Sequence, residues 1–210
     1  TWLRAVVPAW TSAAYDDEKR RVGEVASEFA GLIYTADVDQ RGYFSVPTEP
    51  FAYFYPSDAV ADDFTKFEAP VRPVVLHAPS SPVIKGTQLV RAAVAALREE
   101  GYDFEYVELS NVTNDEVRSE LARAHIVLNE FYAFVPGVFA VEAMAACCAV
   151  LTRADEKIEH QLPAGSNDAW LVTRHHEVKA HLQRLLDDPS LAERYARAGR
   201  DWVVAHAASD

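Results

Sequence analysis

The stretch NEFYAFVPGVFAVEAMAACCAVLT, residues Asn129–Thr152, decides the fold of this chain. It predicts the end of a strand, a loop closed by Pro136–Gly137, a helix that begins near Val138, and another strand from Ala149. A loop that runs into a helix N-terminus presents free backbone N–H groups and the positive end of the helix dipole. Such a helix start suits an anion, for example a diphosphate.

Glu142 lies about one turn inside the predicted helix, and it is the only charged residue between Glu130 and Arg153. A buried carboxylate needs a partner, or a task such as binding a ligand hydroxyl. The alternative is a helix packed between strands with Glu142 at its exposed edge. Both interpretations stay open at this point.

The segment Phe131–Leu151 is long and apolar enough to resemble a membrane span. Pro136, Gly137 and Glu142 interrupt it, and an acid in the middle of a bilayer costs about 2.5–3.5 kcal/mol on insertion scales. We therefore expect buried α/β core here and no transmembrane segment.

Composition points to a globular protein that does not bind nucleic acid. The 210 residues suffice for one large domain, or for one domain with an added arm. Hydrophobic residues make up 50% and charged residues 25%, a balance that argues against general disorder. The net charge of −12 disfavours nucleic acid as a partner but leaves room for a local positive site that binds a nucleotide.

The adjacent cysteines Cys147 and Cys148 point in different directions from one helix end, so we expect small core residues and not a disulfide or a metal pair. This fits a reducing compartment and predicts a cytoplasmic protein. The N-terminus carries no signal-peptide pattern, and a sequence that begins with Thr1 leaves open that a longer chain was cut.

Residues 1–70 are irregular, and we expect an arm or the remnant of a second domain there, followed by a linker over Glu68–Arg72 into a domain of residues 71–210. The predicted elements of this first part are a helix over Asp16–Ala30 with an apolar face, a strand over Leu32–Thr35, a turn between Pro47 and Pro50, a strand over Phe51–Tyr55 and an acidic surface segment over Ser57–Phe67.

From Pro73 the pattern becomes regular, with short apolar strands that alternate with helices. The predicted strands are Val74–His77, Phe104–Leu109, His125–Asn129, Ala149–Thr152 and Trp170–Thr173. The predicted helices are Thr87–Glu100 with Thr87 as its cap, a helix from the capping box of Thr113 and Glu116 to Ala124, the helix from Val138, Glu177–Leu186, and Ser190–Ala205 capped by Ser190.

This alternation predicts an α/β fold, a Rossmann-like parallel sheet with helices on both faces. In such sheets ligands bind beyond the carboxyl ends of the strands. The loops Ala78–Gly86 and Glu130–Gly137 both leave strands at that end.

Lys85 lies in the first of these loops, where Gly86–Thr87 opens a helix. A lysine there can place its ammonium on a phosphate while the helix amides hold other oxygens. A solvated lysine is the alternative. Together with the helix start after Pro136–Gly137, two positive helix ends, Lys85 and Glu142 would divide a nucleotide diphosphate and its ribose between them.

The run from Val71 to Asp155 resembles the C-terminal, donor-binding domain of the glycosyltransferases of family 4, which have the GT-B fold. The stretches that carry the resemblance are VVLHAPSSPVIKGTQLVRAAVAAL (74–97), the strand Ala124–Asn129, and GVFAVEAMAACCAV (137–150), which is similar to the family's Gly-x-x-x-x-Glu-Ala-Met-Ala stretch. Asp188–Pro189 and Glu193–Gly199 resemble the end of that domain, and Leu32–Phe67 resembles the passage out of the family's N-terminal domain.

The resemblance implies a retaining transfer of a sugar from a UDP- or GDP-sugar to a glycan or lipid-linked acceptor, as in polysaccharide biosynthesis. It places the diphosphate at Lys85 and Gly86 and the ribose hydroxyls at Glu142. The amides near Gly137, Val138 and Phe139 would bind the phosphates or the sugar. It implies no metal and no further cofactor, because the lysine and the helix ends neutralise the leaving diphosphate.

Two positions depart from the family pattern. Ser80 stands where the family has an arginine five residues before the lysine, and Phe134 stands where it has a second glutamate eight residues before Glu142. Glu130 is the nearest acid and the one catalytic candidate in place of Phe134. A strand end that faces the surface explains Glu130 equally well.

A GT-B enzyme works in a cleft between two domains of similar size, and only the donor half is fully represented here. We expect a companion chain or upstream sequence to carry the acceptor half, through which the protein would lie at the periphery of a membrane. The alternative is a GT-B-derived module that has lost transfer and serves in binding or assembly.

The histidines carry weaker expectations. His77 ends a strand near the predicted site and would either touch a ligand or be satisfied by the backbone. His175–His176 lack the spacing of a metal site. We expect Asp155–Glu159 to be a solvated loop near the base of a nucleotide.

Overall fold

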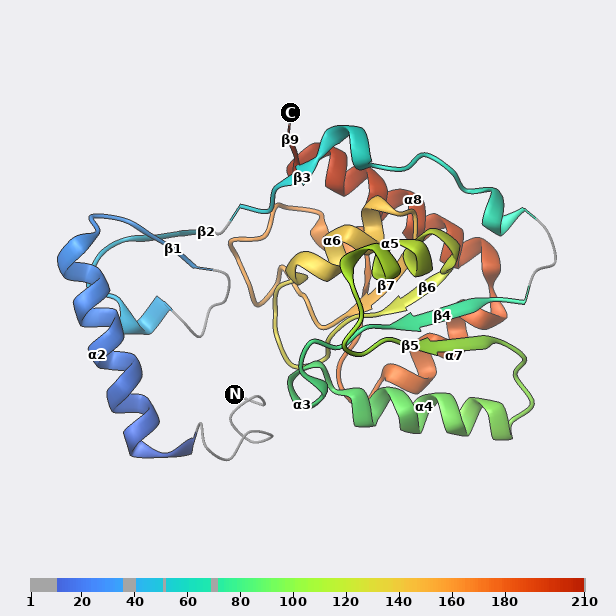
Figure 1. Cartoon of the computed structure of the whole chain (residues 1–210), viewed down its shortest axis with the longest axis horizontal. Coiled ribbons are helices and arrows are strands. Elements are labelled where there is room, and N and C mark those ends of the chain that lie inside the picture. Colours follow the sequence, from blue (N-terminus) through green and yellow to red (C-terminus); the bar gives the residue numbers. More distant parts are fainter. Residues whose placement is uncertain (1–10, 36–40, 51, 69–71, 210) are drawn as a thin grey trace.

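The computed structural model describes residues 11–35, 41–50, 52–68 and 72–209. Its centre is a five-stranded sheet in the order β5-β4-β6-β7-β8, in which every neighbouring pair is parallel (Figure 1). The strands are β4 (Val74–His77), β5 (Glu105–Glu108), β6 (Ile126–Leu128), β7 (Ala149–Thr152) and β8 (Leu171–Val172). The predicted strands and the predicted parallel α/β sheet are thereby confirmed.

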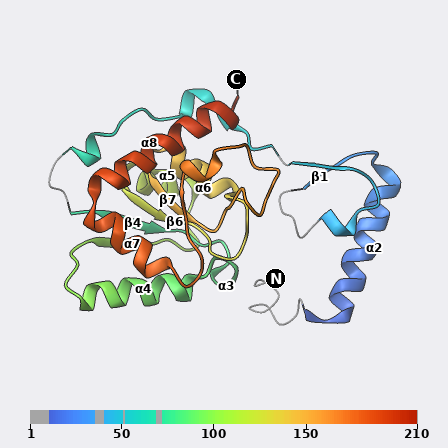
Figure 2. The same cartoon turned by 180° about the vertical axis from the view of Figure 1, so that it is seen from behind.

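Helices cover both faces of this sheet because successive strand residues point to opposite sides. In β4, Val75 packs with α4 (Thr87–Glu99) and α7 (Val178–Asp187), whereas Val74 and Leu76 pack with α5 (Asn114–Arg123) and α6 (Gly137–Ala145). The last helix, α8 (Pro189–His206), places its first turns in one core and its last turns in the other (Figure 2).

Helix starts follow the predictions only in part. The capping box at α5 is present, with the Thr113 hydroxyl accepting from the Glu116 amide at 3.3 Å. The predicted cap at Thr87 is wrong, because the Thr87 hydroxyl is hydrogen-bonded to His77 and Gly86 is the residue before α4. The predicted cap at Ser190 is also wrong, since the residue before α8 is an aspartate whose side chain accepts from the Leu191 amide at 3.0 Å.

The strand order contains one topological switch, between β4 and β6. From β4 the chain crosses to β5 on one side and then returns to β6 on the other side of β4. In open parallel sheets the crevice at such a switch, outside the carboxyl ends of the two strands, is where ligands bind. The loops after β4 and β6 are Ala78–Gly86 and Asn129–Pro136, so both predicted loops border that crevice.

The first part of the chain holds α2 (Ala13–Phe29), β1 (Ile33–Thr35), β2 (Thr48–Pro50) and β3 (Tyr55–Pro56), with short 3-10 turns at Arg41–Tyr43, Ser57–Ala59 and Thr65–Phe67. The helix and the first strand are confirmed. The predicted turn between Pro47 and Pro50 is wrong, because Thr48–Pro50 pairs in parallel with β1. Of the predicted strand Phe51–Tyr55, Phe51 lies outside the described residues and only Tyr55 is in a strand, which pairs with β9 (Ala208–Ser209).

α2 and the β1–β2 pair lie beside the sheet domain, at the side where its strands end (Figures 1 and 2). The apolar face predicted for this helix is largely exposed within the described chain: Val22, Val25 and Phe29 are all exposed, Phe29 to 86%. Hydrophobic periodicity predicted the helix correctly, but a face of this kind shows only what a helix is able to bury.

The segment from Tyr53 to Glu68 packs on the sheet domain. Tyr53 and Tyr55 contact the core, and the Ala61 amide donates to the Ala145 carbonyl at 2.8 Å. The predicted domain boundary between residues 70 and 71 lies outside the described residues, and the division remains a prediction. Within the described part of the chain, no helix combines the length and the apolar character needed to span a bilayer.

Candidate functional site

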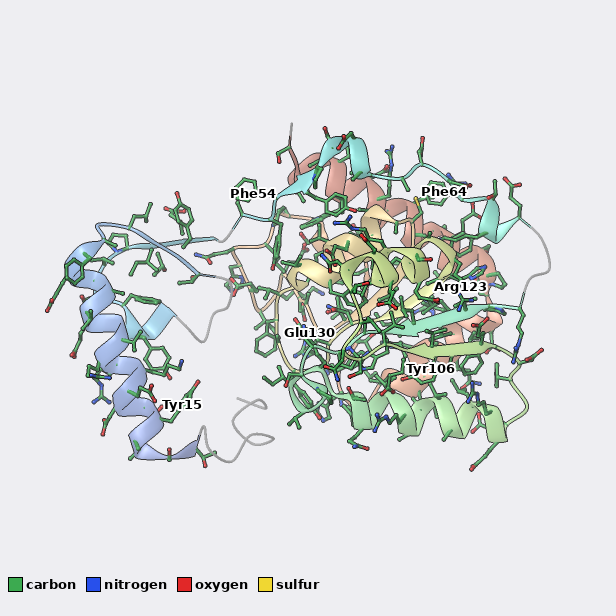
Figure 3. The ribbon with its side chains drawn as sticks, viewed as in Figure 1. Tyr15, Phe54, Phe64, Tyr106, Arg123 and Glu130 are labelled. Atoms are coloured by element: carbon green, nitrogen blue, oxygen red, sulfur yellow. The ribbon has the colours of Figure 1, made fainter. Side chains whose placement is uncertain are left out.

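The predicted residues of the two loops meet at the switch point. Lys85 ends the short helix α3 (Pro82–Lys85) after β4, and Glu130 follows β6. The Lys85 ammonium and the Glu130 carboxylate form an ion pair in which the two side chains are only 18% and 5% exposed. Figure 3 shows Glu130 at the side of the sheet domain that faces α2. The interpretation of Glu130 as a surface-facing strand end is therefore wrong.

Gly137 brings the start of α6 to this ion pair. Its φ of +71° is in the left-handed region, which glycine adopts without strain. A Cβ at this position would lie 3.8 Å from Glu130 Oε1 and 4.0 Å from Lys85 Nζ. The positive end of α6, the lysine and the carboxylate thus form one cluster.

The first amide of α6 is already engaged. The Gly137 N–H donates to the Tyr53 hydroxyl oxygen at 3.2 Å, a contact between residues 84 positions apart. The next amides, those of Val138 and Phe139, belong to the first turn and have no intrahelical acceptor. They are the groups at this helix start that are placed to bind an anion.

Asn129 fixes the loop before α6. Its buried side-chain amide donates to the Pro136 carbonyl at 2.7 Å and to the Thr152 hydroxyl at 3.1 Å. The Arg153 amide donates to the Glu130 carbonyl at 2.8 Å. These bonds tie both ends of the loop to the end of β7, so the positions of Glu130 and Gly137 are set by the sheet.

A cavity of about 540 Å³ opens beside this cluster. It brings together four of the predicted residues, and these are Lys85, Val138, Phe139 and Glu142. Its remaining walls come from the loop after β4, the loop after β5 and the first part of α5, with lining residues Ala78, Pro79, Ser80, Leu109, Ser110, Asn111, Val112, Asn114 and Val117.

The wall from Leu109 to Asn114 was missed by the sequence interpretation, although a signal for it was present. This loop follows a predicted strand, and all carboxyl ends of a parallel sheet lie at one edge. Gly86 does not line the cavity. A Cβ there would lie 3.3 Å from the Tyr132 ring and 3.4 Å from the Phe131 ring, so the start of α4 is covered by these rings. The roles assigned to the site residues remain predictions.

Glu142 is half-buried near the middle of α6. Burial raises the pKa of its carboxyl, and the nearby charge of Arg118 partly opposes this rise. Among the residues that the structure describes, no group forms a hydrogen bond or an ion pair with this carboxylate. A carboxylate kept half out of water without an internal partner fits a ligand-binding role better than a structural one.

Glu142 also lines a second cavity, of about 880 Å³, at the other end of the groove between α5 and α6. Segment 55–66 closes this second cavity, and basic side chains such as Lys66 and Arg118 line it beside apolar ones. Burial and then the charge of Glu142 raise the pKa of Tyr55, which lies on the same wall. The carboxylate is thus shared between two cavities, but only the smaller one contains Lys85 and the start of α6.

The structure shows what surrounds Ser80 and Phe134, the two positions that depart from the pattern the sequence resembles. Ser80 is exposed and lines the smaller cavity, where it supplies no charge. Phe134 lies under the guanidinium of Arg153, with 4.8 Å between that group and the ring centroid. Neither side chain adds a charge to the cavity.

The neighbouring polar residues are structural. His77 is fully buried, with Nδ1 2.6 Å from the Leu128 carbonyl oxygen and Nε2 2.9 Å from the Thr87 hydroxyl, so the backbone-satisfied alternative holds. Burial lowers the pKa of His77, which keeps the ring neutral. The prediction of a solvated loop over Asp155–Glu159 is correct only in part, since Lys157 is exposed but Asp155 and Glu159 are buried. The described residues contain no group of three or more His, Cys, Asp or Glu side chains placed to hold a metal.

A comparison with known protein families identifies the family of this chain. Residues 82–210, more than half of the 210, match the family described as "Glycosyl transferase-like". The chain belongs to this glycosyl transferase-like family. No curated protein matches it at a significant level.

Solved structures show that the glycosyl transferase-like chain has the fold of GT-B enzymes. HepE of Anabaena, solved with UDP and glucose, has a TM-score of 0.68 and 14% identity over 97% of this chain and 65% of its own. Sucrose-phosphate synthase of Thermosynechococcus elongatus has 0.63 and 17%, over 98% and 62%. WaaG, a glycosyltransferase of lipopolysaccharide biosynthesis, has 0.60 and 16%, over 94% and 65%. The chain spans less than two thirds of the length of each.

Proposed function

We propose that this chain is the donor-binding part of a retaining glycosyltransferase, of the family 4 type that its motifs resemble, and that its donor is a nucleoside diphosphate sugar. One observation carries the proposal. At the topological switch of the sheet, a lysine, an uncapped pair of helix amides and an unpaired carboxylate border the same cavity of about 540 Å³. These are the groups that a diphosphate and a ribose need, and they come from two separate stretches of the sequence, the segment after β4 and helix α6.

The diphosphate lies between Lys85 and the first turn of α6. The lysine supplies a charge-assisted hydrogen bond, and the amides of Val138 and Phe139 donate along the helix dipole. These two positive features, at one anion, also take up the charge that develops when the sugar leaves. The proposed mechanism therefore needs no metal, and no cofactor besides the donor itself.

Glu142 accepts hydrogen bonds from the ribose hydroxyls. It lies on α6 one turn beyond Phe139 and lines the same cavity as Lys85. The base then extends to the wall formed by Leu109–Asn114, which offers both backbone groups and the apolar side chain of Val112. This order leaves the sugar at the outer end of the diphosphate, where an acceptor can reach its anomeric carbon.

Relatives support UDP as the first ligand to test. HepE was solved with UDP and glucose, and the TarM protein of S. aureus was solved with UDP. We propose a glycan or a lipid-linked glycan as the acceptor, bound by a companion chain or by further sequence that completes the cleft. In this proposal the 210 residues bind the donor and another part of the enzyme binds the acceptor.

A second candidate function is a non-catalytic binding or assembly module. The specific observation in its favour is that Glu130 neutralises Lys85, while Ser80 and Phe134 provide no replacement for the family's arginine and glutamate. Donor binding without any transfer, even after the acceptor half is supplied, would favour this candidate. Release of nucleoside diphosphate under the same conditions would favour the enzyme.

The test of the donor site is a titration of the chain with UDP and with GDP, followed by NMR chemical shifts so that weak binding is measurable. Lys85→Ala removes a charge-assisted contact of about 1.5–3 kcal/mol, and we expect an affinity about ten- to a hundredfold lower. Lys19→Ala, which removes an exposed lysine of α2, is the matched control and leaves the affinity unchanged. Equal affinities of the wild type and Lys85→Ala would refute the assignment.

A further inference from the structure

We propose that Glu130 is a built-in anion of the donor site: its carboxylate competes with the donor's diphosphate for Lys85 and for the positive start of α6, and so sets the affinity of the site. The inference rests on the proposed function, because it is the diphosphate with which Glu130 competes. It assigns to Glu130 a role in donor affinity and not the role of an acid that binds the donor sugar.

The position of the carboxylate carries the proposal. Glu130 Oε2 is in contact with the Lys85 ammonium, and Oε1 would lie 3.8 Å from a Cβ on Gly137, the first residue of α6. The lysine and this helix start are the two positive features proposed to hold a phosphate. One carboxylate therefore lies against both of them.

Glu130 is held firmly in this place. Its carbonyl accepts from the Arg153 amide at 2.8 Å and from the Thr152 hydroxyl at 3.4 Å, so the backbone is fixed to the end of β7. Only the side-chain torsions remain to move the carboxylate. A donor must either turn this side chain away from Lys85 or bind next to a carboxylate that is 5% exposed.

The balance of charge makes either route unfavourable for a diphosphate. Of the described residues that line the cavity, Lys85 and Glu142 are the charged ones. With Glu130 counted, the site holds one cation and two carboxylates. Like charges a few ångströms apart in a partly buried site repel far more strongly than they do in water, so removal of the Glu130 charge must favour an anion.

The experiment compares UDP with uridine, which carries the base and ribose without the diphosphate. Wild type, Glu130→Gln, Lys85→Ala and the double variant are titrated with each ligand and followed by NMR. We expect Glu130→Gln to bind UDP at least tenfold more tightly and uridine within twofold of the wild type. Lys85→Ala binds UDP more weakly than the wild type, and the double variant binds it more tightly than Lys85→Ala does. Glu99→Gln, an exposed residue of α4, controls for the change in net charge and alters neither affinity.

The wild type alone provides a second measurement, which does not depend on any variant being folded. If Glu130 competes with the diphosphate, the two phosphates add little, and UDP binds no more than about tenfold more tightly than uridine. UDP binding to the wild type over a hundredfold more tightly than uridine, or equal UDP affinities of wild type and Glu130→Gln, would overturn the inference. Failure of both ligands to bind any of the proteins would instead refute the proposed function, and this inference with it.

Discussion

Replacing Glu142 with glutamine should stabilise the protein while it weakens nucleotide binding. The two effects have one cause. The carboxylate is half-buried on α6, burial raises its pKa, and no group in the described part of the chain pairs with it. The free protein therefore keeps a charge in an unfavourable place, and a ligand hydroxyl is what would satisfy that charge.

The size of each effect follows from this geometry. A carboxylate costs more to remove from water than the neutral amide that replaces it, and half exposure keeps this difference to about 0.5–1.5 kcal/mol. For a chain of this length, such a gain raises the melting temperature by about 1–6 °C. Hydrogen bonds from ribose hydroxyls to a charged acceptor are stronger than those to an amide oxygen, so UDP affinity should fall by about 1–2 kcal/mol, or about five- to thirtyfold.

The stability difference should also depend on pH in a defined direction. The folded-state pKa of Glu142 is raised above its unfolded value, so ionisation costs stability. Well below the unfolded pKa of about 4.3 the carboxyl is protonated in both states, and wild type and Glu142→Gln should have nearly equal free energies of unfolding. As the pH rises through the unfolded and then the folded pKa, the wild type loses stability relative to the variant, and the difference then stays constant.

Thermal unfolding monitored by circular dichroism and UDP titration monitored by NMR, on the same preparations, test this reasoning. Glu99→Gln is the matched control, since it makes the same chemical change on an exposed part of α4 and should alter neither quantity. A lower melting temperature of Glu142→Gln with unchanged UDP affinity would mean that the carboxylate is paired inside the protein. That result would refute both the burial argument and the ribose assignment.

Two further predictions concern packing and activity. Gly199→Ala should lower the melting temperature by several degrees in spite of the better helix propensity of alanine, because its Cβ would lie 2.8 Å from Met144 Cγ and 3.0 Å from the Ala169 carbonyl oxygen. Gly31→Ala, whose Cβ would have nothing within 4 Å, should change the melting temperature little, and equal effects of the two variants would contradict the packing at α8. The 210 residues alone should bind UDP with a dissociation constant nearer millimolar than micromolar. They should release no nucleoside diphosphate from UDP- or GDP-sugars with glycan acceptors, since an open half-site cannot position the acceptor or exclude water. Robust turnover by this chain would show that the acceptor half is already present.

The sheet domain was predictable because its signals are local. Four of the five sheet strands from Val74 on are short, mainly apolar runs, and the fifth, β5, begins and ends with glutamate. Each helix has a regular apolar face or a cap within a few residues. In open parallel sheets ligands bind beyond the carboxyl ends of the strands, and this carboxyl-end rule placed Lys85 and Glu142 at one crevice without any knowledge of the contacts. Loop Leu109–Asn114 followed from the same rule and was overlooked.

The errors arose where distant residues decide the outcome. Thr87 has the position of a cap, but its hydroxyl is taken by His77 on the neighbouring strand. The two residues of β3 form a strand only because the end of the chain pairs with them. No local pattern contains that information.

The ion pair between Lys85 and Glu130 could not be predicted from the sequence either. Lys85 and Glu130 are 45 positions apart, and Tyr53 reaches Gly137 from 84 positions away. The carboxyl-end rule brings loops together, but it does not say which side chains neutralise one another. Glu130 was therefore recognised as the nearest acid and not as the partner of the lysine.

This partner bears directly on whether the chain transfers sugar. In a metal-free transfer, negative charge grows on the diphosphate as the sugar departs, and the lysine and the start of α6 must stabilise that charge more in the transition state than in the ground state. While Glu130 holds Lys85, part of that stabilisation is already used inside the protein. An active enzyme regains that stabilisation only if the pair separates when the cleft closes, whereas a binding module can bind the donor beside the intact pair. Movement of the Glu130 side chain on addition of the acceptor half thus distinguishes the two functions at the level of a single contact.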